Sequence, residues 1–169
     1  WGDLPIITEA KQDNEAVLVE DCKRQPRNEV ARFIIANLDT AMTYMADNFE
    51  NRHTRISKDV AMLMKSRVAL YEGSFLTYFK NTPFVPNGTG WPGKEKDYNA
   101  NYEYPTGSID NEIKYFLQTA VEASQDIAEK YKNDLTKNTG IIPQKGDDPD
   151  NPYFTMFGTT DMSKYKEVL

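Results

Sequence analysis

The feature that most constrains this chain is a helical spacing of apolar residues in three separate stretches. Apolar side chains recur every three or four positions in residues 26–46, 57–80 and 110–132, which places them on one face of an α-helix. Residues 81–109, between the second and third stretches, are rich in Pro, Gly, Asn and aromatic side chains. Long helices in antiparallel pairs are typical of a tetratricopeptide-like α-α superhelix. We therefore predict such an all-α fold, with irregular loops and minor strand pieces, in a single domain covering residues 1–169.

Boundary signals accompany each stretch. Pro26 suits a first helical turn, and Ser57 and Asp110 are expected N-caps of the second and third helices. The second helix is apolar or small on most sides, so we expect it to be central and buried, with Gly73 marking close packing or a bend. The expected core stripes are Val30, Phe33, Ile34, Leu38, Ala41, Met42 and Met45; then Val60, Met64, Val68, Tyr71 and Phe75; then Ile113, Phe116, Leu117, Ala120, Ala123, Ser124, Ile127, Ala128 and Tyr131.

The two ends of the chain differ from the helical stretches. Residues 1–8 are expected to be extended, and Pro5 would restrict them to the edge of a sheet. The chain starts without an initiator Met and ends in Glu167-Val168-Leu169, which resembles the beginning of a strand. We expect both ends to be cuts inside a larger protein.

Composition excludes several classes of function. The net charge of −6 and the pI of about 4.9 argue against binding of nucleic acid, whose phosphates repel an acidic protein. No apolar run is long enough to span a bilayer. A single cysteine, Cys22, and a single histidine, His53, allow neither an internal disulfide nor a Cys/His zinc site. Both lie in polar surroundings, which makes a catalytic Cys–His pair a poor interpretation.

Several motifs, in one order along the chain, resemble the SusD/RagB family of outer-membrane nutrient-binding lipoproteins. They cover most of the sequence, although Asn37 stands where the family often has Asp. The motifs are WGDLPIITE (residues 1–9), RQPRNEV (24–30) with FIIANLDTA (33–41), RISKDVA (55–61) with KSRVALYEG (65–73), Tyr115-Phe116 with Ala120, Ala123 and Ser124, and YKEVL (165–169).

The resemblance implies a cell-surface role without chemistry. Members of this family are anchored to the outer membrane through an N-terminal lipidated cysteine, cover a SusC-like TonB-dependent transporter and bind a glycan or another nutrient. The anchor would lie outside this chain. Cys22 is expected inside the fold, and the residues before it, Val19-Glu20-Asp21, do not form a lipid-attachment motif. The expected partners are a glycan and the transporter, with no cofactor.

The stretch of residues 81–109 holds the best candidates for a ligand site. Sugar rings are held by flat aromatic side chains together with neutral hydrogen-bonding groups. The candidate ligand residues are Trp91, Tyr98, Tyr102, Tyr104 and Asn101, accompanied by Asn87 and Asn99. The alternative is that these aromatic side chains hold the long loop to its own scaffold, because a loop of this length needs a core.

Three further interpretations carry less weight. An acidic turn at Asp147, Asp148 and Asp150 could bind calcium, but its spacing is broken by Pro149 and favours a solvated turn. A tetratricopeptide-type scaffold would bind a peptide in a concave groove. A glycosidase would need two carboxylates across the scissile bond. The available acids are Asp97, Glu103, Asp110 and Glu112, and no nucleophile or metal motif accompanies them, so we expect a protein that is not an enzyme.

Overall fold

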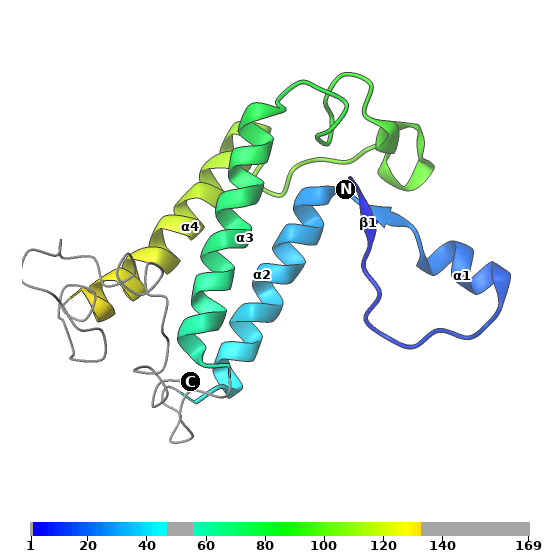
Figure 1. The fold of residues 1–169 in the computed structure, drawn as a ribbon. Coiled ribbons are helices and arrows are strands. Elements are labelled where there is room, and N and C mark those ends of the chain that lie inside the picture. The colour runs from blue at the N-terminus through cyan, green and yellow to red at the C-terminus, as the bar shows by residue number, and fades with distance from the viewer. Residues whose placement is uncertain (1, 47–55, 133–169) are drawn as a thin grey trace, which may run out of the picture.

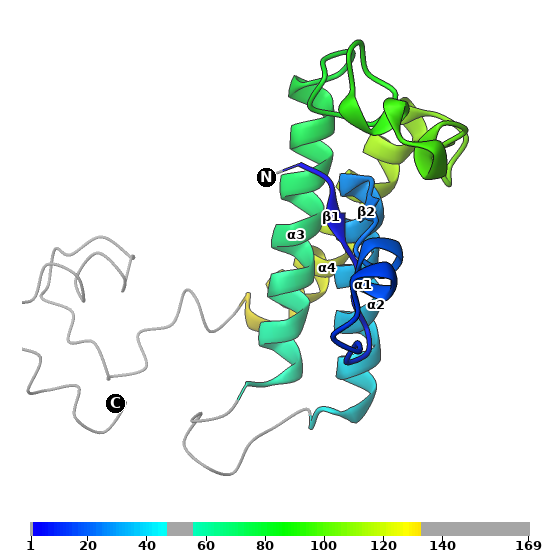
Figure 2. The same ribbon diagram turned by 90° about the vertical axis from the view of Figure 1, so that its right-hand side faces the viewer.

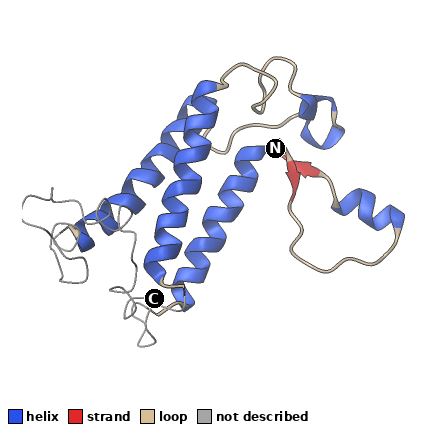
Figure 3. Cartoon of the chain, in the orientation of Figure 1, coloured by secondary structure: helices blue, strands red, loops and turns tan. Residues whose placement is uncertain are grey.

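The computed structural model describes residues 2–46 and 56–132, and most of this part is helical (Figure 3). Three long helices dominate it: α2 (Arg27–Tyr44), α3 (Lys58–Tyr78) and α4 (Ile109–Tyr131). They run in alternating directions, and α3 packs against both α2 and α4 (Figures 1 and 2). The all-α class is confirmed, and the three helices lie close to the ranges that the apolar spacing predicts.

Short elements precede the three long helices. Strands β1 (Leu4–Pro5) and β2 (Arg24–Gln25) form an antiparallel pair, so the extended piece expected near Pro5 is present. Helix α1 (Glu15–Asp21) was not expected from the sequence. It contributes no buried residue. Its start is marked by a local N-cap, because the side chain of Asn14 accepts hydrogen bonds from the first turn.

The core lies where the three long helices meet the loop that joins α3 to α4. We call residues 79–108 of that loop the insert; it contains two short 3₁₀ helices, η1 (Pro92–Glu95) and η2 (Asp97–Asn99). Helices α3 and α4 approach closely at Gly73, where a Cβ atom would lie 2.9 Å from the Leu117 side chain. Gly73 therefore serves close packing. The buried core consists of Ala31 and Ile35 from α2, Ala69 and Leu76 from α3, Val85 from the insert, and Phe116 and Ala120 from α4.

All three predicted core stripes are wrong in part, and in the third Ser124 and Ala128 of α4 are exposed. In α2 the core face is formed by Ala31, Ile35 and Met42, whereas Phe33 and Ile34 are exposed. The prediction that the second helix is buried on most sides is also wrong. Small residues of α3 face the core because they allow its backbone to approach α4. Its larger apolar side chains Val60, Leu63, Met64, Leu70 and Tyr71 are exposed on the other faces.

The start of α4 needs a further correction. The N-cap is Ser108, whose Oγ accepts the Asn111 amide at 3.2 Å, and not Asp110. Asp110 instead forms an ion pair with Lys80, with Nζ and Oδ1 2.6 Å apart. Serine and aspartate are comparable N-caps, so the sequence alone did not separate the two positions.

Some of the sequence predictions fall outside the described residues. These include His53, the acidic turn at residues 147–150 and the last motif at residues 165–169. Within residues 2–46 and 56–132, no helix has both the length and the apolar character needed to cross a membrane. The same ranges contain no group of three or more His, Cys, Asp or Glu side chains placed to hold a metal ion.

Candidate functional site

The insert is joined to the helices by a buried carboxylate, Glu112, in the first turn of α4. Glu112 is completely buried, and it accepts two hydrogen bonds from the Arg32 guanidinium, at 2.7 and 2.9 Å. It also accepts one from Asn28 Nδ2 at 2.9 Å and one from Thr106 Oγ1 at 2.7 Å. Burial alone would raise the pKa of Glu112, but these hydrogen bonds outweigh it and hold the pKa below its ordinary value. Glu112 is therefore an ionised structural group.

Tyr102 extends the same network into the insert. Its hydroxyl accepts a hydrogen bond from Asn28 Nδ2 at 2.7 Å and lies 3.1 Å from the Glu29 carboxylate, to which it can donate. Burial is the main reason that the pKa of Tyr102 is raised, so the hydroxyl stays protonated and neutral. Next to it, the buried Tyr104 donates a hydrogen bond to the carbonyl of Pro86.

A second buried ion pair joins α2 to α3. The Arg27 guanidinium donates to Glu72 at 2.8 and 3.0 Å, and both side chains are less than a tenth exposed. The guanidinium carbon of Arg27 also lies 3.4 Å from the ring centroid of Phe75, a cation–π contact. Two separate ion pairs, the buried Arg27–Glu72 and the partly buried Arg32–Glu112, thus fix the end of the helices that carries the insert.

Asp3 connects the N-terminal segment, residues 2–25, to both α2 and the insert. One carboxylate oxygen accepts the amide N–H of Arg27, the first residue of α2, at 3.1 Å; the other accepts the indole N–H of Trp91 at 2.9 Å. Pro26, at the N-cap position, has no side chain able to make the first bond, so Asp3 caps the helix from a distance in sequence. Burial raises the pKa of Asp3, although these two hydrogen bonds oppose the rise.

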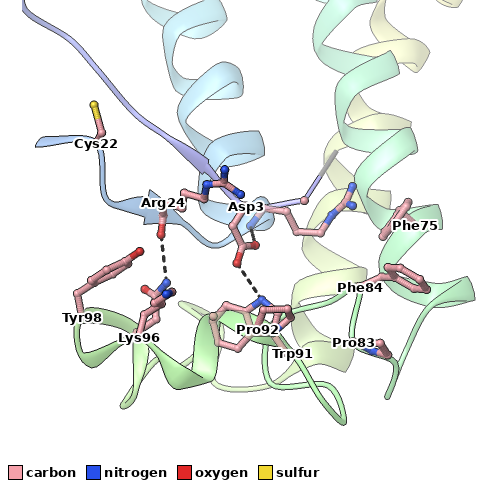
Figure 4. A pocket seen from close by; sticks show the side chains of 14 residues that line it. Asp3, Cys22, Arg24, Phe75, Pro83, Phe84, Trp91, Pro92, Lys96 and Tyr98 are labelled. Atoms are coloured by element: carbon pink, nitrogen blue, oxygen red, sulfur yellow. Dashed lines mark hydrogen bonds between the residues drawn. The ribbon is translucent and has the colours of Figure 1, made fainter. Parts of the chain in front are cut away.

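A cleft of about 770 Å³ opens between this N-terminal segment and the insert (Figure 4). Trp91 is only 4% exposed and lies against Gly93, where any Cβ atom would come within 2.1 Å of the indole Cζ2. Phe84 and Tyr98 are the open aromatic surfaces, with exposed fractions of 60% and 41%. The cleft is lined by Gly2, Asp3, Cys22, Arg24, Arg27, Phe75, Pro83, Phe84, Trp91, Pro92, Gly93, Lys96, Tyr98 and Asn99.

The five ligand residues predicted from the sequence take three different positions. Trp91 and Tyr98 line the cleft. Tyr102 and Tyr104 lie outside the lining and support the insert through the hydrogen bonds described above, which is the anchoring role weighed as the alternative. Asn101 is exposed and does not line the cleft.

Several residues of the cleft were not singled out from the sequence. Phe84, the most exposed aromatic side chain of the lining, stands in a proline-rich turn, where a phenylalanine gives no clear signal of binding. Asn99 was noted only as a companion, and its side chain donates to the backbone carbonyl of Arg24 at 3.1 Å. Cys22, expected inside the fold, is exposed at the C-terminal end of α1.

Charges in the cleft are mostly positive. Arg24 and Lys96 are exposed, and Arg27 is neutralised by Glu72. Among the described residues, the single carboxylate in the lining is Asp3, whose two oxygens already accept N–H groups. Asp97, Glu103, Asp110 and Glu112, the acids considered for glycoside hydrolysis, are not part of the lining. The cleft can therefore stack and hydrogen-bond a polar ligand, and it presents cations to that ligand.

The comparisons with known proteins add no further identification. A search against protein-family models, curated proteins and solved structures finds no match for the chain. The resemblance to the SusD/RagB family therefore rests on the sequence motifs and stays a prediction.

Proposed function

We propose that this chain is a non-catalytic glycan-binding subunit of a SusCD-like nutrient uptake system, and that the glycan binds in the cleft between the N-terminal segment and the insert. The observation that carries the proposal is the lining of that cleft. Two exposed aromatic rings, Phe84 and Tyr98, stand beside hydrogen-bonding side chains in a hollow of about 770 Å³. That volume falls in the range of small-molecule sites and suits a short saccharide.

The physical basis is stacking on a preorganised surface. The C–H faces of a sugar ring pack against aromatic faces, and the hydroxyl groups need polar partners at the rim. The rings here are mounted on a support fixed by Asp3–Trp91, Arg27–Glu72 and Arg32–Glu112. Since a fixed support loses little conformational entropy on binding, more of the contact energy becomes affinity.

We also propose that the chain does not hydrolyse the glycan that it binds. Glycoside hydrolysis uses a pair of carboxyl groups, either about 5–5.5 Å apart or about 6.5–9.5 Å apart. Of the residues that the structure describes, the cleft lining offers Asp3 alone, and its oxygens accept the indole N–H of Trp91 and the first amide N–H of α2. We therefore favour a ligand that is bound and passed on unchanged.

The proposed setting follows from the family resemblance. The chain would belong to a SusD/RagB-type lipoprotein anchored in the outer membrane at the cell surface, outside this segment, and it would deliver its ligand to a SusC-like TonB-dependent transporter. In this setting the antiparallel pair of α2 and α3 would be one hairpin of a tetratricopeptide-like superhelix. The side-by-side packing of α2, α3 and α4 supports that arrangement.

The alternative, a tetratricopeptide-type scaffold for peptides, has less support. Such a scaffold would present a concave face rich in exposed asparagine and basic residues. The groove between α2 and α3, about 740 Å³ in volume, is instead lined largely by apolar side chains, among them Ile34, Met64 and Leu70. Its described lining contains no asparagine, and Arg67 is the one exposed basic residue there, since Arg27 is buried against Glu72.

The test is a glycan-binding screen with matched variants of the full chain. Soluble plant, algal and host polysaccharides would be compared by affinity electrophoresis, and the glycans retained would be titrated by calorimetry. Phe84→Ala and Tyr98→Ala should each weaken binding about tenfold, the effect of removing one stacking surface. Tyr78→Ala is the matched control, because Tyr78 is 83% exposed on the last turn of α3 and lies outside the cleft.

Two results would overturn the proposal. One is retention of every bound glycan by both cleft variants at the affinity of Tyr78→Ala. The other is release of new reducing ends from a bound glycan, since turnover would make the chain a hydrolase.

A further inference from the structure

We infer that the glycan held in the cleft carries an anionic group, a carboxylate or a sulfate, and that Arg24 and Lys96 bind this group beside the ring of Tyr98. The inference rests on the proposed glycan-binding function and narrows its ligand class from sugars in general to acidic sugars. The juxtaposition of two cations with an exposed aromatic ring carries it.

Arg24 and Lys96 differ from the other cations near the cleft. Arg27 is paired with Glu72, and Lys23 is paired with Glu20. Within the part of the chain that the structure describes, the side chains of Arg24 and Lys96 make no hydrogen bond and no ion pair, although both line the cleft. Acidic residues outnumber basic ones in this protein, 26 to 20. Two cations that form no ion pair in one cleft therefore indicate a site for an anionic ligand.

Both cations are held in place through the backbone. Arg24 belongs to β2, and its carbonyl accepts the side-chain N–H of Asn99 at 3.1 Å. Lys96 is the residue directly before η2, the short helix that contains Tyr98. The bond from Asn99 therefore fixes the strand that bears one cation against the helix that follows the other. Figure 4 shows Lys96 and Tyr98 at one end of the cleft, with the backbone carbonyl of Arg24 facing them and its guanidinium extending toward Asp3; Phe75 and Phe84 lie at the other end.

The acids nearby leave this end of the cleft positive. Asp3 is the one carboxylate in the described part of the lining; it interacts electrostatically with Arg24, but both of its oxygens accept N–H groups and it is half-buried. Glu95 and Asp97 are exposed neighbours of Lys96 in sequence and do not line the cleft. Among the described residues, the lining thus presents two cations that form no ion pair at contact distance, against one carboxylate whose oxygens already accept N–H groups.

The chemistry of these side chains selects the ligand. A guanidinium binds a carboxylate or sulfate through two parallel N–H bonds, and an ammonium adds a point charge with three donors. A neighbouring tyrosine ring takes the C–H face of the same sugar. A uronic acid or a sulfated sugar presents both features within one residue. A neutral sugar would leave the two cations without an anionic partner.

The test compares acidic and neutral forms of one polymer on the full chain. Oligogalacturonate and its methyl ester share a backbone and differ in charge, and dextran sulfate and dextran form the sulfate pair. We expect calorimetry in low salt to show at least about tenfold tighter binding of one acidic form over its neutral partner, the gain from one charge-assisted contact. A preference for oligogalacturonate would identify a carboxylate as the anion, and a preference for dextran sulfate would identify a sulfate.

Variants connect the preference to the two cations. Arg24→Gln and Lys96→Gln should each lower affinity for the acidic polymer several-fold and leave the neutral polymer unchanged. Lys94→Gln is the matched control, because Lys94 is exposed on η1, close to Lys96 in sequence, and does not line the cleft. Raising the salt concentration should reduce the preference in the wild type and have less effect in the two cleft variants.

The outcomes distinguish this inference from the proposed function. Equal affinity for acidic and neutral forms, with both weakened by Tyr98→Ala, would overturn the anionic ligand and keep the glycan site. An acidic preference that Lys94→Gln reduces as much as Arg24→Gln would overturn the assignment to these two cations. Absence of binding to every polymer in the screen would overturn both proposals.

Discussion

The two ends of the helical bundle are held together by different means. At the end that carries the insert, Arg27–Glu72 is buried on both sides, and in Arg32–Glu112 the carboxylate is buried and the guanidinium partly buried. At the opposite end, Lys130 pairs with Asp59 at 2.7 Å on the surface, and the hydroxyl of Tyr131 donates to the same carboxylate. Buried charges must be satisfied in one geometry, whereas exposed pairs tolerate many. The insert end is therefore the part of the molecule where a single substitution should have large consequences.

The largest expected effect comes from removing the buried carboxylate of α4. Glu112→Ala leaves the Arg32 guanidinium without its buried partner and removes acceptors from Asn28 and Thr106. We expect the free energy of unfolding to fall by about 3–5 kcal/mol, measured by urea denaturation. Glu122→Ala, on the exposed side of the same helix, is the control and should change little. Equal losses from the two variants would remove the distinction between the two ends.

The second expected effect tests whether Arg27 and Glu72 act as a unit. Arg27→Met leaves a buried carboxylate without its partner and should cost about 3 kcal/mol of unfolding free energy. Adding Glu72→Met removes the unpaired buried carboxylate, so the double variant should recover most of the lost unfolding free energy. A double variant as unstable as the sum of the two single variants would show that the pair is not coupled.

The pH dependence of stability should report the ionised state of Glu112. The pKa of Glu112 lies below 4.5 in the folded protein, so its contribution is present above that pH and is lost as the pH falls through the folded value. The pKa of Asp3 is raised in the folded protein, so its contribution to stability changes with pH in the opposite direction. Between about pH 6 and about pH 3, the wild type should therefore lose more stability than Glu112→Gln. Parallel curves in urea would contradict the ionised state assigned to Glu112.

A smaller effect is expected from the hydrogen bond between Trp91 and Asp3 in the cleft lining. Trp91→Phe keeps an aromatic ring but removes the N–H that Asp3 accepts, and should cost about 1–2 kcal/mol. In an Asp3→Ala background the same substitution should cost less, because the partner is already gone. Additive losses in this double-mutant cycle would exclude the coupling between the N-terminal segment and the insert.

The smallest effect is expected at the opposite end of the bundle. Asp59→Asn removes the charge that faces Lys130 and Tyr131, and an exposed pair of this kind contributes little. The melting temperature should stay within experimental error of the wild type. A large drop would show that the two ends are stabilised alike.

Sequence reasoning located the helices better than it located their faces. Apolar residues spaced three or four positions apart mark a helix whatever it packs against, so the three long helices lie near the predicted ranges. Which face turns inward depends on partners distant in sequence. Small residues such as Ala69 and Gly73 took the contact with α4 because they permit close approach, and Met64 and Leu70 were left exposed.

The candidate site was predictable in composition and not in arrangement. Trp91 and Tyr98 could be selected because tryptophan and tyrosine in a long loop suggest sugar binding. The supporting roles of Tyr102 and Tyr104 follow from partners on α2 and in the insert, which no local pattern encodes. Asp3, Arg24 and Arg27 enter the cleft from segments far from the insert in sequence.

The position of Trp91 gives the cleft an optical reporter of its own. The chain contains only two tryptophans, and Trp91 lies buried in the cleft wall with its indole N–H donated to Asp3. Indole emission responds to changes in local polarity and in hydrogen bonding. Occupation of the cleft should therefore shift the fluorescence of the unlabelled protein, and the Trp91→Phe variant provides the blank for that signal.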